Sequence, residues 1–495
     1  MARPLPLARM NPRTRDRLGL AAGGVLAVAV GWWVASGDFL LPTLLAVAGV
    51  AGACTLALGL SFDVLVLGGL LVGYIVGNRG FAQLSLVPGF PLLPAEAGLA
   101  LGLGWLGVRA AVARRWPWRR DALNVAVLAW MIIASGRIVT DVRVHGFLAL
   151  RDFAMVYYAL FFFVAQDQAA RTGLARRFLG GALLLATVAA IPLFEFFRRY
   201  PEFFLQQLTF RGTPLIFVKG DLVATFLAAG VILTFARFER TRRWPWLLLA
   251  LAGTVTVLSS DNRASLVGLL AATGWFVLAR RWLWLKVQAL ALGCAALLLL
   301  GAAVFGWVSP GARPLTPVYQ RVASIVGVGS GASADADAGY KIDNNRFRLV
   351  WWQMVARETL TQAPWFGLGF GYDLAEPFTR VYFPDAEEDF TARSPHSIVV
   401  TALGRTGVIG LTAFLVVIGA IAARTWRELR LPASTGGNSE YWLVAWVILT
   451  SACFGVVLEG PMGAVVFWTV LGLANAPREG VTASADALGE QNSDF

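Results

Sequence analysis

The chain alternates between long apolar stretches and short polar connections. A helix that spans a bilayer needs about 20 mostly apolar residues, because its backbone groups must pair within the segment where no water is present. The apolar pattern therefore predicts an all-α polytopic membrane protein. Counting such windows predicts about 14 spanning helices, near residues 18–36, 39–59, 62–77, 95–113, 122–139, 150–166, 178–197, 222–236, 244–260, 263–279, 286–307, 396–421, 441–458 and 463–476.

One connection, residues 308–395, is far longer than the others. Loops of that length usually carry structure or function. Apolar residues recur within it at helical spacing and predict an amphipathic helix over 342–362, whose apolar face rests on the bundle or on the outer leaflet. Residues 325–339 are rich in Gly, Ala and Ser and predict a flexible linker. The predicted organisation is thus a transmembrane bundle (1–307), a loop module (308–395), C-terminal transmembrane helices (396–476) and a disordered cytoplasmic tail (477–495).

Composition and charge narrow the class of protein. Hydrophobic residues make up 57% and charged residues 15% of the chain, whereas soluble domains carry about 25% charged residues, so an ordinary soluble or disordered protein is excluded. The net charge of +12 does not indicate nucleic-acid binding, because the basic residues form short runs between apolar stretches. With the N-terminus inside, these runs fall on the cytoplasmic side and the long loop is exterior. The runs lie within residues 114–120, 171–177, 237–243, 280–286 and 424–430.

Four arginines depart from this orientation rule. Arg151, Arg211, Arg263 and Arg405 fall at exterior helix ends, in an exterior loop or within a span. An ionisable side chain at membrane depth is costly and usually faces a protein or water-filled interior. Taken singly, Arg405 and Arg151 are better interpreted as snorkelling or ion-paired side chains, and that interpretation is as good as a ligand role for Arg263. Together they predict an anion-binding site at the exterior face.

The histidines His145 and His396 both fall on the exterior side. His396 begins a predicted span where the long loop returns, at the mouth of the bundle. Nearby arginines favour the neutral imidazole by penalising a second positive charge, and a neutral imidazole can accept a hydroxyl proton. We therefore predict that His396 is a general base; the alternative is a histidine that hydrogen-bonds backbone at a helix start. His145 has no comparable setting and is interpreted as structural.

Weaker motifs surround this position. Asp389, in an acidic run, and Glu459, in a short exterior turn, are candidates for orienting a base or binding sugar hydroxyls, although a solvated acidic surface is the default interpretation. The Asp-Ala-Asp at 335–337 lies in the linker, which argues against a metal site. The glycines of 367–371 do not join a strand to a helix, so a tight turn is favoured over a phosphate-binding loop. The cysteines show no metal or disulfide spacing.

Several pieces in order resemble the bacterial O-antigen ligase and polymerase family over roughly residues 205–475. They are Arg211-Gly212-Thr213; Ser259-Ser260-Asp261-Asn262-Arg263-Ala264-Ser265; Arg346 and Arg348 with Trp351-Trp352; Ala363-Pro364-Trp365-Phe366-Gly367-Leu368-Gly369-Phe370-Gly371; Pro395-His396-Ser397; and Leu403-Gly404-Arg405-Thr406-Gly407-Val408-Ile409-Gly410. Ser397 departs from the asparagine that family members often carry after the histidine. Asp261 and Asn262 also separate the serines from the arginine.

The resemblance implies a GT-C-type glycosyltransferase of the bacterial inner membrane whose active site faces the periplasm. It implies transfer of a glycan from a polyprenyl diphosphate carrier to a glycan or lipid A-core acceptor, without nucleotide, metal or other cofactor and without nucleic acid. His396 would deprotonate the acceptor, Arg263 and Arg211 would hold the diphosphate, and Arg346 or Arg348 would close a site that also contains Arg405 and Arg151. The competing hypotheses are a transporter or flippase for lipid-linked sugars, for which we see no internal repeat, and a noncatalytic envelope scaffold.

Overall fold

The computed structural model describes residues 59–85, 92–114, 119–260, 262–304, 336–382, 393–431 and 438–477, and the single residues 24, 28 and 55. The chain divides into two compact units, Met1–Val66 and Leu67–Phe495. The predicted spans at 18–36 and 39–59 fall almost wholly outside the described residues, as do Asp389, most of the predicted linker and the tail beyond residue 477.

The described part of the chain is almost entirely helical. Its main helices are α3 (Phe62–Val72), α4 (Arg79–Ala82), α5 (Pro94–Ala113), α6 (Ala122–Ser135), α7 (Ile138–His145), α8 (Phe147–Asp152), α9 (Ala154–Tyr157), α10 (Leu160–Arg171), α11 (Gly173–Arg199), α12 (Gly220–Thr241), α13 (Trp244–Ser259), α14 (Arg263–Leu278), α15 (Trp282–Val304), α17 (Ala336–Gln362), α18 (Glu376–Tyr382), α19 (Ile398–Arg430), α20 (Ser439–Ala452) and α21 (Pro461–Asn475). Two π-helices, η2 (Gly73–Gly77) and η3 (Phe203–Gln207), and a hairpin of β1 (Thr209–Phe210) and β2 (Thr213–Pro214) complete it.

Five helical segments among the described residues are long and apolar enough to cross a membrane. Four of them are the helices α5, α11, α12 and α19, and the fifth is the segment Phe147–Arg171, which contains α8, α9 and α10. Helices α6 and α7, which are bent by 41° relative to each other, make a sixth if they form one broken span. The chain is therefore an all-α, multi-pass membrane protein, as predicted. The count of about 14 spans stays a prediction.

Local sequence explains where several helices start. Asp121 accepts a hydrogen bond from the Asn124 N–H at the start of α6, and Thr172 does the same for Ala175 at the start of α11. Asn262 caps α14 by accepting a hydrogen bond from the Ser265 N–H at 2.8 Å. One of the two residues that separate the serines from Arg263 is therefore the N-cap of this helix. Each cap satisfies an amide that the first helical turn leaves without a partner.

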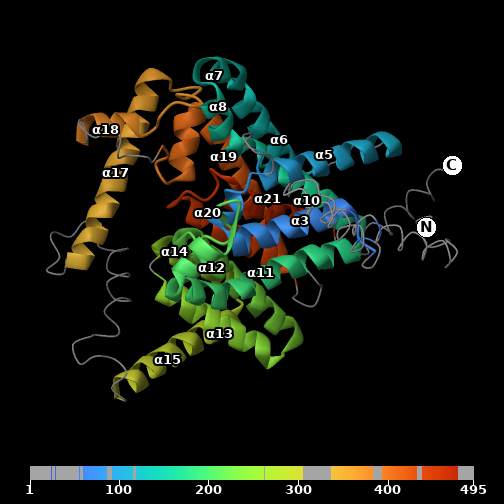
Figure 1. The fold of residues 1–495 in the computed structure, drawn as a ribbon, viewed down its shortest axis with the longest axis vertical. Helices are drawn as coiled ribbons and strands as arrows, with labels where there is room; N and C mark the ends of the chain where they lie inside the picture. Colours follow the sequence, from blue (N-terminus) through green and yellow to red (C-terminus); the bar gives the residue numbers. More distant parts are fainter. Residues whose placement is uncertain are drawn as a thin grey trace. The chain divides into compact units, whose positions relative to one another are not determined.

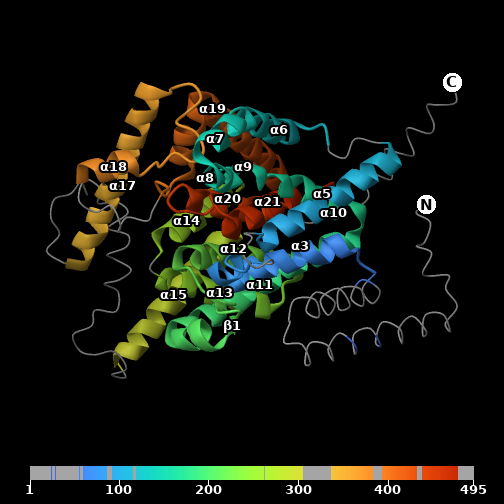
Figure 2. The ribbon, with the colours of Figure 1, turned by 45° about the horizontal axis from the view of Figure 1, so that its top comes forward.

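The centre of the second unit is built from α10, α12, α14, α20 and α21 (Figures 1 and 2). Small residues let these helices approach closely, as in many membrane bundles. A Cβ at Gly472 of α21 would lie 2.5 Å from the Phe162 carbonyl oxygen of α10, and one at Gly268 of α14 would lie 2.8 Å from that of Val447 on α20. Helix α20 is buried over most of its length, so side chains near its C-terminal end face protein instead of lipid.

The predicted amphipathic helix is confirmed as α17. Trp351 and Val355 form a buried cluster with Leu374, Ala375 and Phe378, and α17 also packs against α19 (Figure 1). Its apolar face thus rests on the protein. The helix begins at Ala336, so the prediction of a flexible linker was wrong for 336–339.

The predicted span at 441–458 was wrong at its C-terminal end. Helix α20 stops at Ala452, and residues 454–460 are non-helical. Backbone of this kind is tolerated at membrane depth where it is covered by protein or lines a cavity. Here the Phe454 carbonyl accepts a hydrogen bond from Arg348 at 2.8 Å, and residues 456 and 459–462 line the cavity described next.

Candidate active site

A cavity of about 990 Å³ opens between segments that are distant in the sequence. The start of α5, helices α4, α8 and α9, Lys219 before α12, the segment 393–405 and the turn before α21 all contribute to its wall. Five cationic side chains line it, Arg79, Arg151, Lys219, Arg393 and Arg405. Its carboxylates among the described residues are Glu96, Asp152 and Glu459, and His396 completes the polar wall. Cations thus outnumber carboxylates, as an anion-binding site requires.

His396 occupies the wall just before α19. Its φ of +56° is left-handed, a conformation uncommon for a residue other than glycine and often found at functional sites. Trp352 fixes the preceding residue by donating from Nε1 to the Pro395 carbonyl at 2.6 Å, and the Trp351 ring lies 5.9 Å from the imidazole. Burial, then the positive charges of Arg348 and Lys219, lower the pKa of His396 to about 4, against an opposing effect of Asp221. The imidazole is therefore neutral near pH 7, as predicted.

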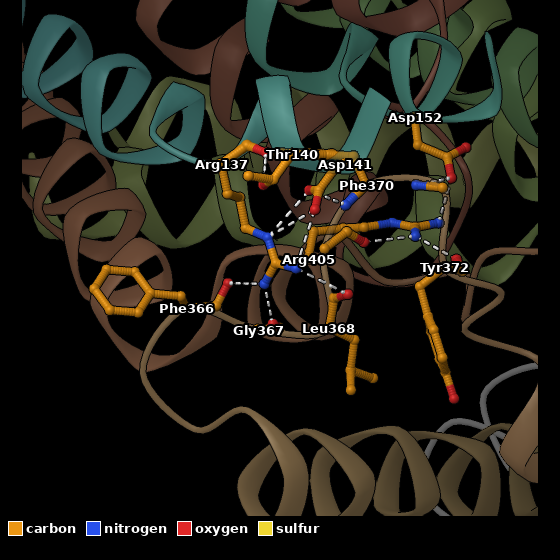
Figure 3. Close-up of polar contacts among 12 residues, drawn as sticks. Arg137, Thr140, Asp141, Asp152, Phe366, Gly367, Leu368, Phe370, Tyr372 and Arg405 are labelled. Atoms are coloured by element: carbon orange, nitrogen blue, oxygen red, sulfur yellow. Dashed lines mark hydrogen bonds and ion pairs between the residues drawn. The ribbon is translucent and has the colours of Figure 1, made fainter. Parts of the chain in front are cut away.

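Three of the cavity arginines converge on one carboxylate, that of Asp152. Arg405 lies 2.8 Å from it, Arg151 3.6 Å and Arg393 3.9 Å. Arg405 is buried, with 3% of its side chain exposed, and donates to the carbonyls of Gly369 and Tyr372 (Figure 3). The sequence placed Arg405 and Arg151 at an anion site; the structure places both in the cavity wall, with Asp152 as their protein partner.

The glycine-rich segment 367–371 is a tight turn, which confirms the prediction. Gly367, Gly369 and Gly371 have φ values of +73°, +97° and +90°. A Cβ on Gly369 would lie 2.6 Å from the Arg137 guanidinium, and one on Gly371 would lie 2.3 Å from the His145 Cβ. The turn therefore needs glycine both for its backbone angles and for the close approach of neighbouring side chains.

Arg137 and Arg405 hold this turn from two sides (Figure 3). Arg137 donates to the carbonyls of Phe366, Gly367 and Leu368, and Asp141 accepts from the Phe370 N–H at 2.8 Å. Arg137 and Asp141 were not predicted from the sequence. An arginine followed four residues later by an aspartate at the end of a predicted span was the available signal, since residues at that spacing pair on a helix.

Helix α19 breaks at Gly407, where φ is +65° and ψ −166°. The N–H groups of Val408 and Ile409 donate to the carbonyls of Pro364 and Trp365. The loop motif at 363–371 and the helix motif at 403–410 thus form one contact, although they are far apart along the chain.

The other arginines that were predicted to bind the diphosphate are not among the described residues that line the cavity. They are Arg211, Arg263, Arg346 and Arg348. Arg348, near His396, donates to the Phe454 carbonyl and interacts electrostatically with Arg263 at the start of α14. Arg346 is exposed. Arg211 is also exposed, at the turn of the β1–β2 hairpin, with its guanidinium 5.4 Å from the Phe210 ring.

Glu459 lies in the turn before α21 and faces the cavity. The Thr401 hydroxyl donates to its Oε1 at 2.7 Å, whereas Oε2 is buried without a hydrogen-bond partner among the described residues. Burial raises the pKa of Glu459, although hydrogen bonds from Ser394 and Thr401 and the charges of Arg405 and Lys219 oppose that effect. Its free oxygen can accept a hydrogen bond from a ligand hydroxyl.

Other polar side chains of the wall were not predicted. They are Arg79, Gln83, Glu96, Asp152, Tyr157, Tyr158, Lys219, Arg393, Ser394 and Thr401. Glu96 accepts hydrogen bonds from the hydroxyls of Tyr157 and Tyr158 at 2.9 and 2.5 Å. Over the described residues, the structure brings together no group of three His, Cys, Asp or Glu side chains arranged to hold a metal ion.

Comparison with known proteins identifies one region. Residues 247–415 match the family model described as O-antigen ligase. This match confirms the resemblance to the O-antigen ligase and polymerase family for that part of the chain. It contains Arg263, Arg348, His396 and Arg405, whereas Arg79, Lys219 and Glu459 lie outside it. No curated protein matches the chain.

Proposed function

With residues 247–415 assigned to the O-antigen ligase family, we propose that this membrane protein transfers a glycan from a polyprenyl diphosphate carrier to an acceptor hydroxyl. The acceptor is another carrier-linked glycan or lipid A-core, and the reaction takes place at the periplasmic face of the bacterial inner membrane. The single observation that carries the proposal is the neutral, half-buried His396 in the wall of a cavity with five cations.

The chemistry follows from these groups. The acceptor oxygen forms a bond to the anomeric carbon, and its proton passes to the His396 imidazole. The bond between the anomeric carbon and the diphosphate oxygen breaks, and its electron pair leaves with the diphosphate. Guanidinium and ammonium groups stabilise the negative charge that develops on this leaving group, a task that a divalent cation performs in many nucleotide-sugar enzymes.

Two further groups have roles in this scheme. Glu459, whose Oε2 is buried without a partner among the described residues, accepts a hydrogen bond from the acceptor sugar and holds it beside the imidazole. Arg348 adds positive charge next to His396, and Arg263 adds to it through its electrostatic interaction with Arg348. Diphosphate binding by Arg211 and Arg346 remains a prediction from the resemblance, because both side chains are exposed outside the described cavity wall.

Reconstitution in liposomes tests the proposal. Purified protein is supplied with a polyprenyl diphosphate glycan and an acceptor, and glycan transfer is measured for the wild type, His396→Ala and Arg263→Ala, with and without a chelator. Arg143→Ala is the matched control, because Arg143 is exposed and is not among the residues that line the cavity.

We expect transfer by the wild type and by Arg143→Ala, insensitivity to the chelator and strong loss in the other two variants. Product length separates ligation of one glycan from polymerisation. Movement of the lipid-linked glycan across the bilayer without transfer would instead indicate a flippase, and full turnover by His396→Ala would remove the proposed base.

A further inference from the structure

The cations of the cavity fall into two groups. Arg151, Arg393 and Arg405 share the Asp152 carboxylate, as described above. Arg79, at the start of α4, and Lys219, before α12, do not contact that carboxylate in any described interaction. These two residues are far apart in the sequence, yet they line the same cavity as His396.

One buried side chain, that of Asn78, joins the two segments. Its Oδ1 accepts hydrogen bonds from the Arg79 N–H and the Lys219 N–H, each at 3.0 Å. The Arg79 N–H also donates to the Phe217 carbonyl at 2.9 Å, and the Phe217 N–H donates to the Gly77 carbonyl at 3.1 Å. The main chains that carry Arg79 and Lys219 are thus fixed to each other through neutral groups.

The backbone at Asn78 has an unusual conformation. Asn78 is fully buried and has φ +54° and ψ −123°, backbone angles that residues other than glycine rarely adopt. At the adjacent Gly80, a Cβ would lie 2.5 Å from the Pro214 carbonyl oxygen. The hydrogen bonds of Asn78 and the small size of Gly80 thus allow residues 78–80 to pack closely against residues 214–219.

The charges of this pair remain available to a ligand. The Arg79 guanidinium lies 5.0 Å from the Phe217 ring, and the structure shows it no ion pair with a described carboxylate. Lys219 lies 3.4 Å from Asp221 in an ion pair whose side chains are 31% and 27% exposed. Solvent reaches this half-buried pair and screens it, so a more highly charged anion can displace it.

We propose that Arg79 and Lys219 form a phosphate-binding pair, positioned by Asn78, that holds the diphosphate of the donor beside His396. The inference rests on the proposed function and adds to it the residues that engage the carrier's phosphates. The planar guanidinium binds one phosphate through two parallel hydrogen bonds, while the ammonium acts as a point charge on the other.

Full-length protein in liposomes tests the pair through the KM for the polyprenyl diphosphate glycan. We expect Arg79→Ala and Lys219→Ala each to raise the donor KM about tenfold or more, because each removes a charge-assisted contact. The acceptor KM should stay unchanged. Arg143→Ala serves again as control. Asn78→Gly accepts the unusual φ and removes the cross-link, so it should raise the donor KM without loss of folded protein.

Competition separates the sources of phosphate. Polyprenyl diphosphate without glycan should inhibit the wild type and lose about tenfold in affinity in the Arg79 and Lys219 variants. Vesicles with and without phosphatidylglycerol provide the second arm. If these variants keep the wild-type donor KM and lose only a dependence on anionic lipid, the pair binds a lipid headgroup and the inference is overturned.

The two proposals fail separately. If the wild type transfers glycan and His396→Ala does not, while Arg79→Ala and Lys219→Ala keep both kinetic constants, the phosphate-binding pair is wrong and the glycosyltransferase stands. If the wild type transfers no glycan from any polyprenyl diphosphate donor, the proposed function itself is wrong.

Discussion

Two groups of cations in one cavity wall are held in different ways. Around Asp152, three arginines share a carboxylate, and Arg405 also donates to two loop carbonyls. Around Asn78, Arg79 and Lys219 are positioned through their backbone amides, and the cross-linking group is a neutral amide. The first arrangement uses positive charge to hold the structure together; the second leaves it for a ligand.

The comparison shows that an arginine in a polar cavity is not by itself a ligand-binding residue. Removing one partner of a buried ion pair leaves an uncompensated charge and costs far more than removing an exposed pair. The partner of each cation therefore separates structural arginines from binding ones. Substitutions in the two groups should give opposite patterns in stability and in donor affinity.

The largest effect is expected for Arg405→Ala. Loss of this buried side chain removes the nearest of the three arginine partners of Asp152 and leaves the carbonyls of Gly369 and Tyr372 without their donor, so the protein should lose about 3–5 kcal/mol of stability. Thermal unfolding of the purified protein measures it, with the exposed Arg143→Ala as control. A variant that unfolds like the wild type but binds donor poorly would move Arg405 into the second group and break the comparison.

His396→Ala tests the proposed base in the cavity wall that carries both groups. Loss of a general base should lower kcat about a hundredfold or more, with little change in unfolding temperature or donor KM, since the ring makes no described ion pair. Kinetics with saturating donor measure kcat. If instead KM rises while kcat is retained, His396 is a binding residue and not the base.

Gly367→Ala sharpens the structural side of the comparison. A Cβ there would lie 2.5 Å from the Gly407 nitrogen and 2.6 Å from the Arg405 carbonyl carbon, at a φ of +73°. We expect a cost of about 1–3 kcal/mol. The matched control is Gly274→Ala, because Gly274 lies in α14 with open space around its Cβ position; alanine there should be neutral or stabilising. Equal unfolding temperatures for the two variants would contradict the close contact between turn and helix.

The smallest effect is expected in the pH profile of Lys219→Ala. On the proposed mechanism His396 can accept a proton only when it is neutral, so kcat/KM of the wild type should fall as the pH drops through its pKa of about 4. Removing the Lys219 charge raises that pKa, which moves the acidic limb to higher pH. Arg143→Ala should keep the wild-type profile. An unmoved limb in Lys219→Ala would show that Lys219 does not act on the imidazole.

The sequence predicted those features that depend on local periodicity. Apolar windows located α5, α11, α12, α14 and α21 to within a few residues, and apolar residues at helical spacing located α17. The glycine turn at 367–371 and the neutral state of His396 were also predictable, because each follows from neighbours in the chain or from the known charge of arginine.

Features that depend on distant partners were not predictable. Nothing near Asp152 in the sequence indicates that it pairs with Arg393 and Arg405, and nothing near Asn78 indicates a bond to Lys219. The early end of α20 was not predictable for the same reason. The residues that follow it are largely apolar, yet they are non-helical, bond to Arg348 through the Phe454 carbonyl and contribute to the cavity wall. An apolar window records hydropathy and carries no information on such contacts.

The break of α19 at Gly407 has a consequence for biogenesis. Residues 364 and 365 are synthesised before α19. Their carbonyls cannot form these hydrogen bonds until the amides of Val408 and Ile409 have been synthesised. Until these bonds form, the interrupted span carries bare polar backbone that lipid cannot solvate. Insertion of this helix is therefore linked to closure of the preceding loop, and a chain truncated between the two segments lacks the donors that these two carbonyls require.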